Sequence, residues 1–425
     1  SSRQPVAVIG SGPAGLSAAY HLARLGYPVR IFENQPELGG VMRNGIPPYR
    51  LPRHVLDREI AFILQHGVTA ETNRRILKAD LVHLSREFAS IFVATGLQES
   101  RTLNLGNLDS AVVTQGVDFL DCSRQAAKRM DGQRVIVIGG GNTAIDAART
   151  ARRLGAEVQI VYRRTRAEMP AIPEEIEEAL EEGIGLSELL APVTLSAAND
   201  QRALCCQRMQ LGEPDESGRR RPVPVEGAQA MVALPCDRLI LALGQNPDLS
   251  VFPEGSEIRE NGQLLGLTGA PVFAGGDFQS NEGTVAAAIG SGRKAAWHIH
   301  QVLSGENLFP TVVSEPVPLT SIRLRAHNRV PRHEAALRKP EQRLADFGEV
   351  RLGLEERPAH AEAVEESRRC FSCGSCTGCD ICRASCPEGV LSRRGDEYSF
   401  NYDYCKGCGL CQFECPRGVI VMEQL

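Results

Sequence analysis

Two cysteine runs near the C-terminus constrain this chain more than any other feature. The first comprises Cys376, Cys379, Cys382, Cys386 and Pro387, and the second comprises Cys405, Cys408, Cys411, Cys415 and Pro416. Each run reads C-x2-C-x2-C-x3-C-P, and the surrounding sequences CTGCDICRASCPEGVL and CKGCGLCQFECPRGVI align at an offset of 29 residues. The chain therefore contains an internal duplication whose cysteines are in register.

This spacing is the iron–sulfur ligand pattern of bacterial two-cluster ferredoxins, in which three thiolates come from one run and the fourth from the other. We therefore assign one 4Fe-4S cluster to Cys376, Cys379, Cys382 and Cys415, and the second to Cys405, Cys408, Cys411 and Cys386. A zinc ribbon or a disulfide framework would show cysteine pairs instead of triplets closed by Cys-Pro. Cys370 and Cys373 extend the first run at the same three-residue step, and the sequence leaves them open between free thiols and cluster ligands.

Length and composition set the class of protein. The 425 residues suffice for about three domains of ordinary size. With 42% hydrophobic and 23% charged residues and a net charge of −5, the composition is that of a soluble globular protein and not of a nucleic-acid binder. No apolar run reaches the roughly 18 residues of a membrane span, and the N-terminal SSRQPVAVIG lacks a signal-peptide pattern. Thiolates kept free for iron–sulfur ligation predict a reducing, cytoplasmic setting.

A dinucleotide-binding fingerprint occupies the N-terminus. We expect strands at 6–9 and 29–32 and a helix at 16–25, with the sequence Gly10-Ser11-Gly12-Pro13-Ala14-Gly15 between the first strand and the helix. Gly10 permits the tight turn, Gly12 the approach of the backbone to a pyrophosphate, and Gly15 close helix packing. Glu33, at the end of the second strand, is placed to accept hydrogen bonds from a ribose hydroxyl.

A second fingerprint lies in the middle of the chain. A strand at 134–138 leads into Gly139-Gly140-Gly141-Asn142-Thr143-Ala144, and a helix at 145–154 precedes a strand at 158–162 that ends in Arg163-Arg164. Two arginines stand where an acidic residue would face a ribose, which favours the 2′-phosphate of NADP(H), although arginines stacked on adenine would serve NAD equally. Two fingerprints require two dinucleotides. FAD and NAD(P) are the economical choice, because a flavin splits a hydride into the single electrons that clusters carry.

Later stretches complete the first domain and define the fold. A strand at 272–274 runs into a turn at Asp277, which suits the flavin's ribityl hydroxyls, and a helix at 286–303 begins after Thr284, although the same pattern also fits a solvated turn and a core helix. We predict an α/β fold with two Rossmann-like domains, the NAD(P) domain being inserted into the FAD domain, plus a C-terminal bacterial-type 2x[4Fe-4S] ferredoxin domain. The predicted parts are an FAD domain at 1–125 and 239–306, an NAD(P) domain at 126–238, a connector at 307–369 and a ferredoxin-like domain at 370–425.

Several stretches resemble the small-subunit family of glutamate synthase, which consists of FAD-dependent, NAD(P)-linked oxidoreductases. They are GSGPAGLSAAYHLARLGYPVRIFE, GGVMRNGIPPYRLPR, GGGNTAIDAARTARRLGAEVQIVYRRTRAEMPA, ALGQNPD and FAGGD. The continuation to EESRRCFSCGSC is similar to ferredoxin-tailed members of the family, such as flavoprotein subunits of 2-oxoacid:acceptor oxidoreductases and of phenylglyoxylate dehydrogenase in particular. In the glutamate synthase subunit the cluster-binding segment precedes the flavin domain, whereas here the cysteine runs follow it, which argues against glutamate synthesis.

The resemblance also implies a set of cofactor contacts. For FAD they are Gly10, Gly12, Pro13, Ala14, Gly15, Glu33, Gly40, Thr95, Gly96, Asp277, Thr284 and Val285. For NAD(P) they are Gly141, Asn142, Thr143, Ala144, Arg163 and Arg164, to which the fingerprint adds Gly139. We assign no catalytic side chain, because the hydride and the electrons move between cofactor atoms.

Other features carry less weight. Cys122, Cys205, Cys206 and Cys236 are interpreted as buried structural thiols, and no cysteine follows Gly39-Gly40, which argues against a flavin-linked disulfide. The Glu-rich run at 174–182 is interpreted as a solvated helix. The connector carries seven Arg or Lys against two acidic residues between 319 and 343, and we expect it to wrap the flavin domain.

The combined prediction is an electron-transfer flavoprotein subunit. Electrons pass between NAD(P)(H), FAD and two 4Fe-4S clusters to other subunits of an oxidoreductase complex, most simply a 2-oxoacid oxidoreductase of the phenylglyoxylate type. The alternatives are a stand-alone NAD(P)H:ferredoxin reductase, a glutamate synthase small subunit, and a non-catalytic assembly module with vestigial nucleotide sites.

Overall fold

The computed structural model describes most of the chain in two compact units. The first unit comprises Ser1–Phe309 and Arg338–Val350, and the second comprises Pro310–Leu337 and Arg351–Leu425. The described residues are 3–106, 112–125, 128–198, 201–215, 218–227, 230–266, 269–280, 282–309, 316–332, 334, 336–352 and 360–422. Among them, no helix is long and apolar enough to cross a membrane. The first unit is discontinuous in sequence, because a short piece of the connector belongs to it.

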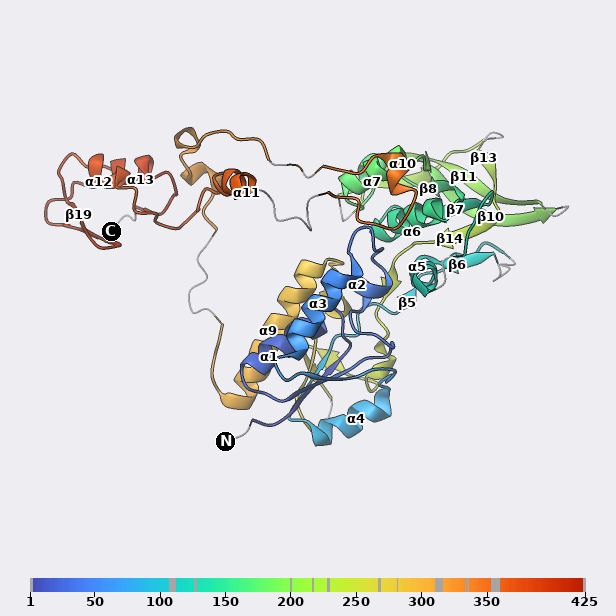
Figure 1. Cartoon of the computed structure of the whole chain (residues 1–425), viewed down its shortest axis with the longest axis horizontal. Helices are drawn as coiled ribbons and strands as arrows, with labels where there is room; N and C mark the ends of the chain where they lie inside the picture. The colour runs from blue at the N-terminus through green and yellow to red at the C-terminus, as the bar shows by residue number, and fades with distance from the viewer. Residues whose placement is uncertain are drawn as a thin grey trace. The chain divides into compact units, whose positions relative to one another are not determined.

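A seven-stranded sheet forms the first nucleotide-binding domain (Figure 1). Its order is β16 (Glu257–Ile258), β17 (Gln263–Leu265), β18 (Val272–Ala274), β4 (Ser90–Val93), β1 (Val6–Ile9), β2 (Val29–Phe32) and β3 (Thr69–Glu71). The strands from β18 to β3 are parallel. Because a parallel sheet is covered on both faces, its central strands are continuous apolar runs, and all four residues of β1 and of β4 are buried.

Helices cover the two faces of this sheet. The helices α1 (Pro13–Arg24), α3 (Arg53–Leu64) and α9 (Val285–Ser304) share one core with one face, and α4 (Lys78–Glu87) packs on the other (Figure 1). Shorter elements lie at the edges of the sheet: α2 (Val41–Asn44), α8 (Asp277–Ser280) and the antiparallel pair β5 (Glu99–Ser100) and β15 (Gln245–Asn246). Gly292 of α9 lets this helix approach α1 closely, because an added Cβ would lie 2.1 Å from the carbonyl oxygen of Ala14.

The second nucleotide-binding domain has a five-stranded parallel sheet. Its order is β6 (Val113–Gln115), β14 (Arg238–Leu241), β7 (Arg134–Ile138), β8 (Glu157–Val161) and β9 (Gly185–Ser187). Its helices are α5 (Gly116–Gln125), α6 (Asn142–Arg153) and α7 (Pro173–Glu181). A four-stranded antiparallel sheet adds to it, with β10 (Leu190–Ala198), β11 (Gln201–Pro214), β12 (Arg220–Pro224) and β13 (Met231–Pro235). The α/β prediction is confirmed, with a domain inserted between β4 and β18.

The Glu-rich run forms a helix with Glu174, Glu177 and Glu181 exposed, as interpreted, but the interpretation is wrong for the other three glutamates. The side chains of Glu175, Glu178 and Glu182 are buried against Arg149, which is itself fully buried on α6. Arg149 reaches Glu178 and Glu182 at 2.7 Å each and also pairs with Glu175. The glutamates recur at a spacing of three and four residues because they form the inner face of α7 rather than its solvated face.

The connector is divided between the two units. The strap (Arg338–Val350), which includes α10 (Pro340–Arg343), belongs to the first unit. Its Val350 N–H donates to the Tyr49 carbonyl at 3.1 Å, and its Arg343 pairs with Glu181 of α7 at 2.9 Å. The strap therefore contacts both nucleotide-binding domains.

The second unit combines the rest of the connector with the cysteine-rich segment. Its elements are α11 (His360–Ser367), α12 (Ile381–Ala384), the hairpin β19 (Leu391–Arg394) and β20 (Glu397–Phe400), and α13 (Leu410–Glu414). Connector residues pack on α13: Arg325 lies 5.3 Å from the Phe413 ring centroid, and Arg323 pairs with Glu414. Residues 353–359, which precede α11, lie outside the described part.

Candidate functional site: a nucleotide-linked iron–sulfur centre

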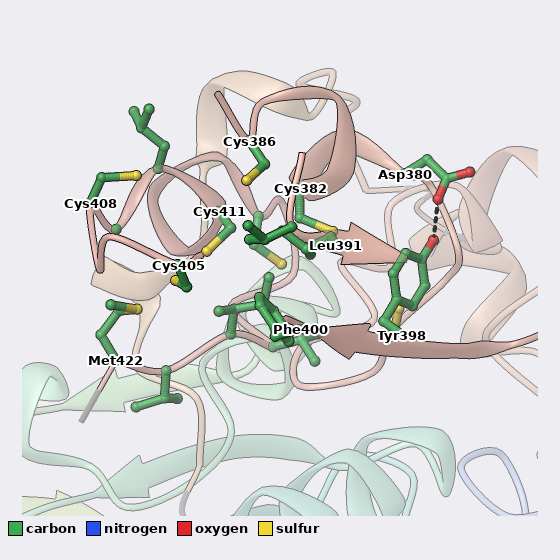
Figure 2. Close-up of a pocket in the computed structure, with 18 of the residues that line it drawn as sticks. Asp380, Cys382, Cys386, Leu391, Tyr398, Phe400, Cys405, Cys408, Cys411 and Met422 are labelled. Carbon is green, nitrogen blue, oxygen red and sulfur yellow. Dashed lines mark hydrogen bonds between the residues drawn. The ribbon is translucent and has the colours of Figure 1, made fainter. Parts of the chain in front are cut away.

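The two cysteine runs meet in one cavity of about 940 Å³ in the second unit (Figure 2). All eight predicted ligands line it: Cys376, Cys379, Cys382, Cys386, Cys405, Cys408, Cys411 and Cys415. The remaining lining is largely apolar and includes Val390, Leu391, Phe400, Leu410, Val419 and Ile420. Tyr398 donates to Asp380 at 2.6 Å at one side of the cavity. Eight soft thiols in an apolar enclosure match the donor set that iron–sulfur clusters require.

Thiols of the two runs influence one another across the cavity. Burial raises the pKa of the Cys382 thiol, and the neighbouring Cys379, Cys415 and Cys376 raise it further. Burial also raises the pKa of Cys411, with contributions from Cys408 and from Cys386 of the other run. Figure 2 shows the Cys386 sulfur directed toward the side of the cavity that carries Cys405, Cys408 and Cys411. The assignment of three thiols of one run and one of the other to each cluster stays a prediction.

Glycines at equivalent positions of the duplication shape the ligand loops. Gly378, between Cys376 and Cys379, has φ of +67°, and Gly407, between Cys405 and Cys408, has φ of +63°. A residue with a side chain rarely adopts this left-handed conformation. The turn brings successive cysteines toward the same cavity. Among the described residues, no three His, Cys, Asp or Glu side chains are grouped so as to hold a single metal ion.

Cys370 and Cys373 lie outside this arrangement. Neither lines the cavity, and both are exposed. The other interpretation of isolated cysteines holds in part: Cys206 and Cys236 are buried, whereas Cys205 is partly exposed and Cys122 is exposed, so the prediction was wrong for Cys122.

The first glycine-rich loop has the geometry of a pyrophosphate cradle. An added Cβ at Gly10 would lie 2.5 Å from the Ala94 carbonyl oxygen, whereas Gly12, at the N-terminal end of α1, has open space around it. Gly40, with φ of +55°, approaches Gly12 so closely that a Cβ would lie 2.7 Å from the Gly12 Cα. An anion can therefore reach the backbone and the positive end of α1 at Gly12. Pro13 and Ala14 form the first turn of this helix, and Gly15 packs on Gly10.

Polar groups around this loop fit a flavin nucleotide. The Glu33 carboxylate accepts hydrogen bonds from the Ser11 N–H at 2.9 Å and the Gln35 N–H at 2.8 Å, which fixes it at the end of β2. The buried Thr95 Oγ1 has no hydrogen-bond partner among the described residues. A buried hydroxyl without a partner is costly, so a bound ligand is the natural partner. The adjacent Gly96, with φ of +68°, leaves open space beside it.

Asp277 and Thr284 lie between β18 and the start of α9. Asp277 begins α8 and accepts a hydrogen bond from the Gly283 N–H at 3.1 Å. Burial raises the pKa of Asp277. Thr284 caps α9 by accepting from the Ala287 N–H at 3.2 Å, and Val285 is the first residue of that helix. The turn from 277 to 284 therefore presents the N-terminus of α9.

The second glycine-rich loop repeats the cradle geometry. An added Cβ at Gly139, with φ of +144°, would lie 2.3 Å from the Ala242 carbonyl oxygen, and Gly141 caps α6 with open space around it. Asn142 accepts from the Ile172 N–H at 3.0 Å, which joins the loop to the start of α7. Thr143 and Ala144 follow in the first turn of α6.

The two arginines after β8 have different surroundings. Arg163 is exposed, whereas Arg164 is buried, pairs with Asp215 at 2.6 Å and donates to the Arg220 carbonyl at 2.8 Å. Arg164 thus joins the sheet of β10–β13 to the domain. Arg163 has the exposed guanidinium that a nucleotide phosphate can approach.

Two separate parts of the chain match known protein families. Residues 4–292 match the family described as pyridine nucleotide-disulphide oxidoreductase, and residues 375–419 match a 4Fe-4S dicluster domain. The chain belongs to the pyridine nucleotide-disulphide oxidoreductase family. A putative glutamate synthase [NADPH] small chain from Cereibacter sphaeroides is 35% identical over 71% of this chain and 77% of its own length, which supports the predicted resemblance. This family member is an FAD-, NAD(P)- and iron–sulfur-dependent oxidoreductase with two 4Fe-4S clusters.

Two relatives match the ferredoxin-tailed organisation. The NADP(+)-dependent formate dehydrogenase subunit beta of Moorella thermoacetica is 40% identical over 88% of this chain. The NADPH-Fe(3+) oxidoreductase subunit beta of Geobacter sulfurreducens is 35% identical over 87% of it. This chain spans only 55% and 61%, respectively, of the lengths of those two relatives.

Solved structures support the fold. FprA from Mycobacterium tuberculosis in complex with NADPH aligns with a TM-score of 0.59 at 16% identity, over 71% of this chain and 85% of FprA. Lactococcus lactis thioredoxin reductase aligns with a TM-score of 0.52 at 19% identity, over 72% of this chain and all of that protein.

Proposed function

We propose that this chain is the electron-transfer subunit of a larger oxidoreductase, in which it exchanges hydride with NADP(H) and single electrons with a partner subunit that holds the substrate site. One observation carries the proposal: two dinucleotide-binding folds and a cavity lined by eight thiols occur in one chain. When bound, the flavin exchanges a hydride with the nicotinamide and single electrons with the clusters.

The chain's own residues bind and orient the cofactors. Gly12 and the N-terminus of α1 bind the flavin pyrophosphate, Glu33 the ribose, and Thr95 and Asp277 further hydroxyl or carbonyl groups of the flavin. Gly141 and the N-terminus of α6 bind the second pyrophosphate. The eight thiolates hold the clusters in the two crossed groups of four, with Cys415 completing the first and Cys386 the second.

NADP(H) is the proposed nucleotide. Arg163 is exposed at the end of β8, where a guanidinium can bind a 2′-phosphate, and Arg164 supports the loop from within. The names of two relatives also specify the phosphorylated nucleotide. We expect Arg163→Ala to raise the KM for NADPH at least tenfold and to leave the KM for NADH nearly unchanged, because one charge-assisted phosphate contact contributes about 1.5–3 kcal/mol.

The overall reaction of the complex depends on the partner subunit that holds the substrate site. A 2-oxoacid oxidoreductase of the phenylglyoxylate type remains a proposed partner, with electrons flowing from the clusters to NADP⁺. A formate dehydrogenase is the second candidate, which the first relative's name favours. Either partner would deliver its electrons singly to the same clusters.

The decisive experiment is anaerobic native purification with mass identification of co-eluting chains. We expect larger subunits to co-elute, about eight irons per chain, and a flavin absorbance band that NADPH bleaches. A monomer that reduces soluble ferredoxin at high turnover would favour the stand-alone reductase. A chain without bleachable flavin would favour the assembly module.

The iron assignment has its own test. Cys376→Ser combined with Cys379→Ser removes two ligands of one cluster, so we expect iron to fall from about eight to about four per chain. Cys122→Ser, at an exposed cysteine far from the cavity in sequence, serves as the control and should leave the iron content unchanged. Complete loss of iron would contradict two separately held clusters.

A further inference from the structure

Cys370 and Cys373 form an exposed Cys-x-x-Cys pair outside the cluster cavity. Both cysteines are exposed, and the turn that carries them follows α11 directly. The eight cavity thiols complete two sets of four ligands without them, so cluster binding does not require this pair. Paired cysteines at this spacing occur in redox-active dithiols, so their surroundings decide what they can do.

The turn is fixed against the chain next to a cluster ligand. Arg417, two residues after Cys415, donates to the carbonyl of Cys370 at 3.3 Å and to that of Phe371. The Gly374 N–H donates in return to the Arg417 carbonyl at 2.9 Å. Because both ends of the turn bond to Arg417, the pair is held beside the cavity wall while its thiols lie outside it.

Connector residues support the turn from another side. The Phe371 ring lies 4.6 Å, between centroids, from the ring of His327, which itself bonds to the Pro416 carbonyl at 2.9 Å. An added Cβ at Gly374, with φ of +72°, would lie 3.1 Å from Val317. Specific contacts within the second unit therefore hold the turn in place after α11.

The Cys370 sulfur has the surroundings of an attacking thiolate. The Ser372 N–H points at it, with the nitrogen 3.4 Å away, and the Ser372 hydroxyl lies 3.9 Å from it. Ser372 has φ of +49°, a left-handed conformation that non-glycine residues seldom adopt and that aims its N–H at the sulfur. The hydrogen bonds from Ser372, with the nearby charge of Arg417, hold the pKa of Cys370 below its ordinary value.

We propose that Cys370 and Cys373 form a thiol–disulfide couple, in which Cys370 attacks small-molecule or peptide disulfides and Cys373 resolves the mixed disulfide. The site goes beyond the proposed transfer of electrons between nucleotide and partner, and it lies in the second unit, next to the chain that carries the cluster ligand Cys415.

The chemistry balances in two exchange steps. The Cys370 thiolate attacks a disulfide RSSR, the S–S bond breaks, and RS⁻ leaves as the mixed disulfide Cys370–S–S–R forms. Cys373, after losing its proton to water, attacks the Cys370 sulfur and releases the second RS⁻, which leaves a Cys370–Cys373 disulfide; the two thiolates take up protons. Two electrons and two protons restore the dithiol, and 4Fe-4S clusters are one-electron donors of the required class.

Glutathione disulfide is the probe for the test. The full-length holoprotein is equilibrated without oxygen in buffers of varied ratios of reduced to oxidised glutathione, quenched in acid, alkylated and mapped by peptide mass spectrometry. We expect a Cys370–Cys373 disulfide whose fraction rises with oxidised glutathione, at unchanged iron content. Under reducing conditions at neutral pH, Cys370 should alkylate at least about threefold faster than the exposed Cys122.

Variants separate the two roles and exclude a ligand role. Cys373→Ser should trap glutathione on Cys370, whereas Cys370→Ser should abolish both the adduct and the disulfide, and Cys122→Ser should change neither. The proposal is overturned if both cysteines stay free in every buffer, or if Cys122 takes the adduct instead. Loss of iron in Cys370→Ser or Cys373→Ser would also overturn it, because the pair would then be cluster ligands.

Discussion

At the residue scale, the guanidinium of Arg149 lies at the centre of a buried ion network in the first unit. It is fully buried and pairs with Glu175, Glu178 and Glu182, while Arg153 shares Glu182 at 2.7 Å. The Arg153 guanidinium lies 3.9 Å from the centroid of the buried Tyr49 ring. A buried ion network adds little net stability over apolar residues, but the removal of one partner leaves the others buried and uncompensated.

Substitution of Arg149 tests how much the folded state depends on this ion network. Arg149→Ala would leave three buried carboxylates with two arginines, because Glu182 keeps Arg153 and Glu175 keeps Arg50. Glu178 would lose its partner, so we expect the free energy of unfolding to fall by about 3–5 kcal/mol. Urea unfolding, followed by flavin fluorescence, measures the loss. Arg129→Ala removes an exposed ion pair with Asp131 and should leave the unfolding midpoint unchanged. A similar small effect for both variants would mean that water or rearranged side chains replace the network.

Asp146 makes the stability of the first unit depend on pH. Burial raises the pKa of Asp146 to about 7, although Arg50 of the first domain pairs with it at 2.7 Å and lowers it. The Asp146 Oδ1 has no partner among the described residues. In the unfolded chain an aspartate has a pKa of about 3.9, so between that pH and 7 the folded state holds a proton that the unfolded state has lost. The stabilisation is complete below about pH 4 and is lost as the pH rises through 7.

The measurable consequence is a change in the free energy of unfolding with pH. Between pH 5 and 6.5 the free energy of unfolding should fall by up to about 1.4 kcal/mol per pH unit from this group alone. Asp146→Asn, which keeps the size of the side chain but cannot titrate, should remove this component when urea unfolding is repeated across the same pH range. Equal slopes for the two proteins would show that Asp146 stays ionised through its contact with Arg50.

At the element scale, the strap is the segment whose role depends most on a few contacts. Arg338 closes it by pairing with Asp346 at 2.7 Å, Arg343 is buried and reaches Glu181 on α7, and Phe347 lies 6.4 Å from Tyr49 between ring centroids. Since Tyr49 belongs to the first domain and α7 to the second, the strap links the two domains. Its few contacts predict a low free energy of local opening.

Limited trypsin digestion reports on the opening of the strap. If the buried Arg343 side chain contributes about 1.4 kcal/mol to holding it, Arg343→Ala should speed cleavage after Arg338 about tenfold. Glu181→Gln is the matched control, because Glu181 is half exposed and its side chain can still accept a hydrogen bond. Equal cleavage rates for the wild type and Arg343→Ala would show that the strap is held by Phe347 and the backbone instead.

Elements whose signal is local could be predicted from the sequence. The strands Val6–Ile9 and Arg134–Ile138 follow from apolar runs that end in glycine-rich loops, and Val29–Phe32 is an apolar stretch that ends at Glu33. The inner face of α7 could not be predicted, since a run of glutamates indicates solvent unless the arginines of α6 are known to face it. Tyr49 and Arg50 were likewise missed as domain contacts, because the residue that Arg50 binds lies 96 positions away in sequence.

At the scale of the whole molecule, the two compact units do not follow one another along the chain. Residues 338–350 belong to the first unit, although residues 310–337 before them belong to the second. The cysteine spacing predicted which thiols share a cavity, because the duplication encodes both runs, and it left Cys370 and Cys373 open because their three-residue step is the same. No comparable pattern in the sequence predicts how the connector is divided between the two units. A basic, proline-containing segment fits solvent, a partner or a domain surface equally well, and only its contacts show that residues 338–350 complete the first unit.

Two truncations test this discontinuity. A chain ending at residue 352 keeps the strap, whereas one ending at residue 309 leaves Tyr49 and Glu181 without their strap contacts. We expect the longer chain to bind FAD and to pass electrons from NADPH to a dye without any iron. The shorter chain lacks the partly buried Phe347 and the buried Arg343, and full burial of an aromatic side chain contributes about 1.5–3 kcal/mol, so its thermal midpoint should be lower by several degrees. Identical midpoints for the two truncations would mean that residues 338–350 are only a tether between the units.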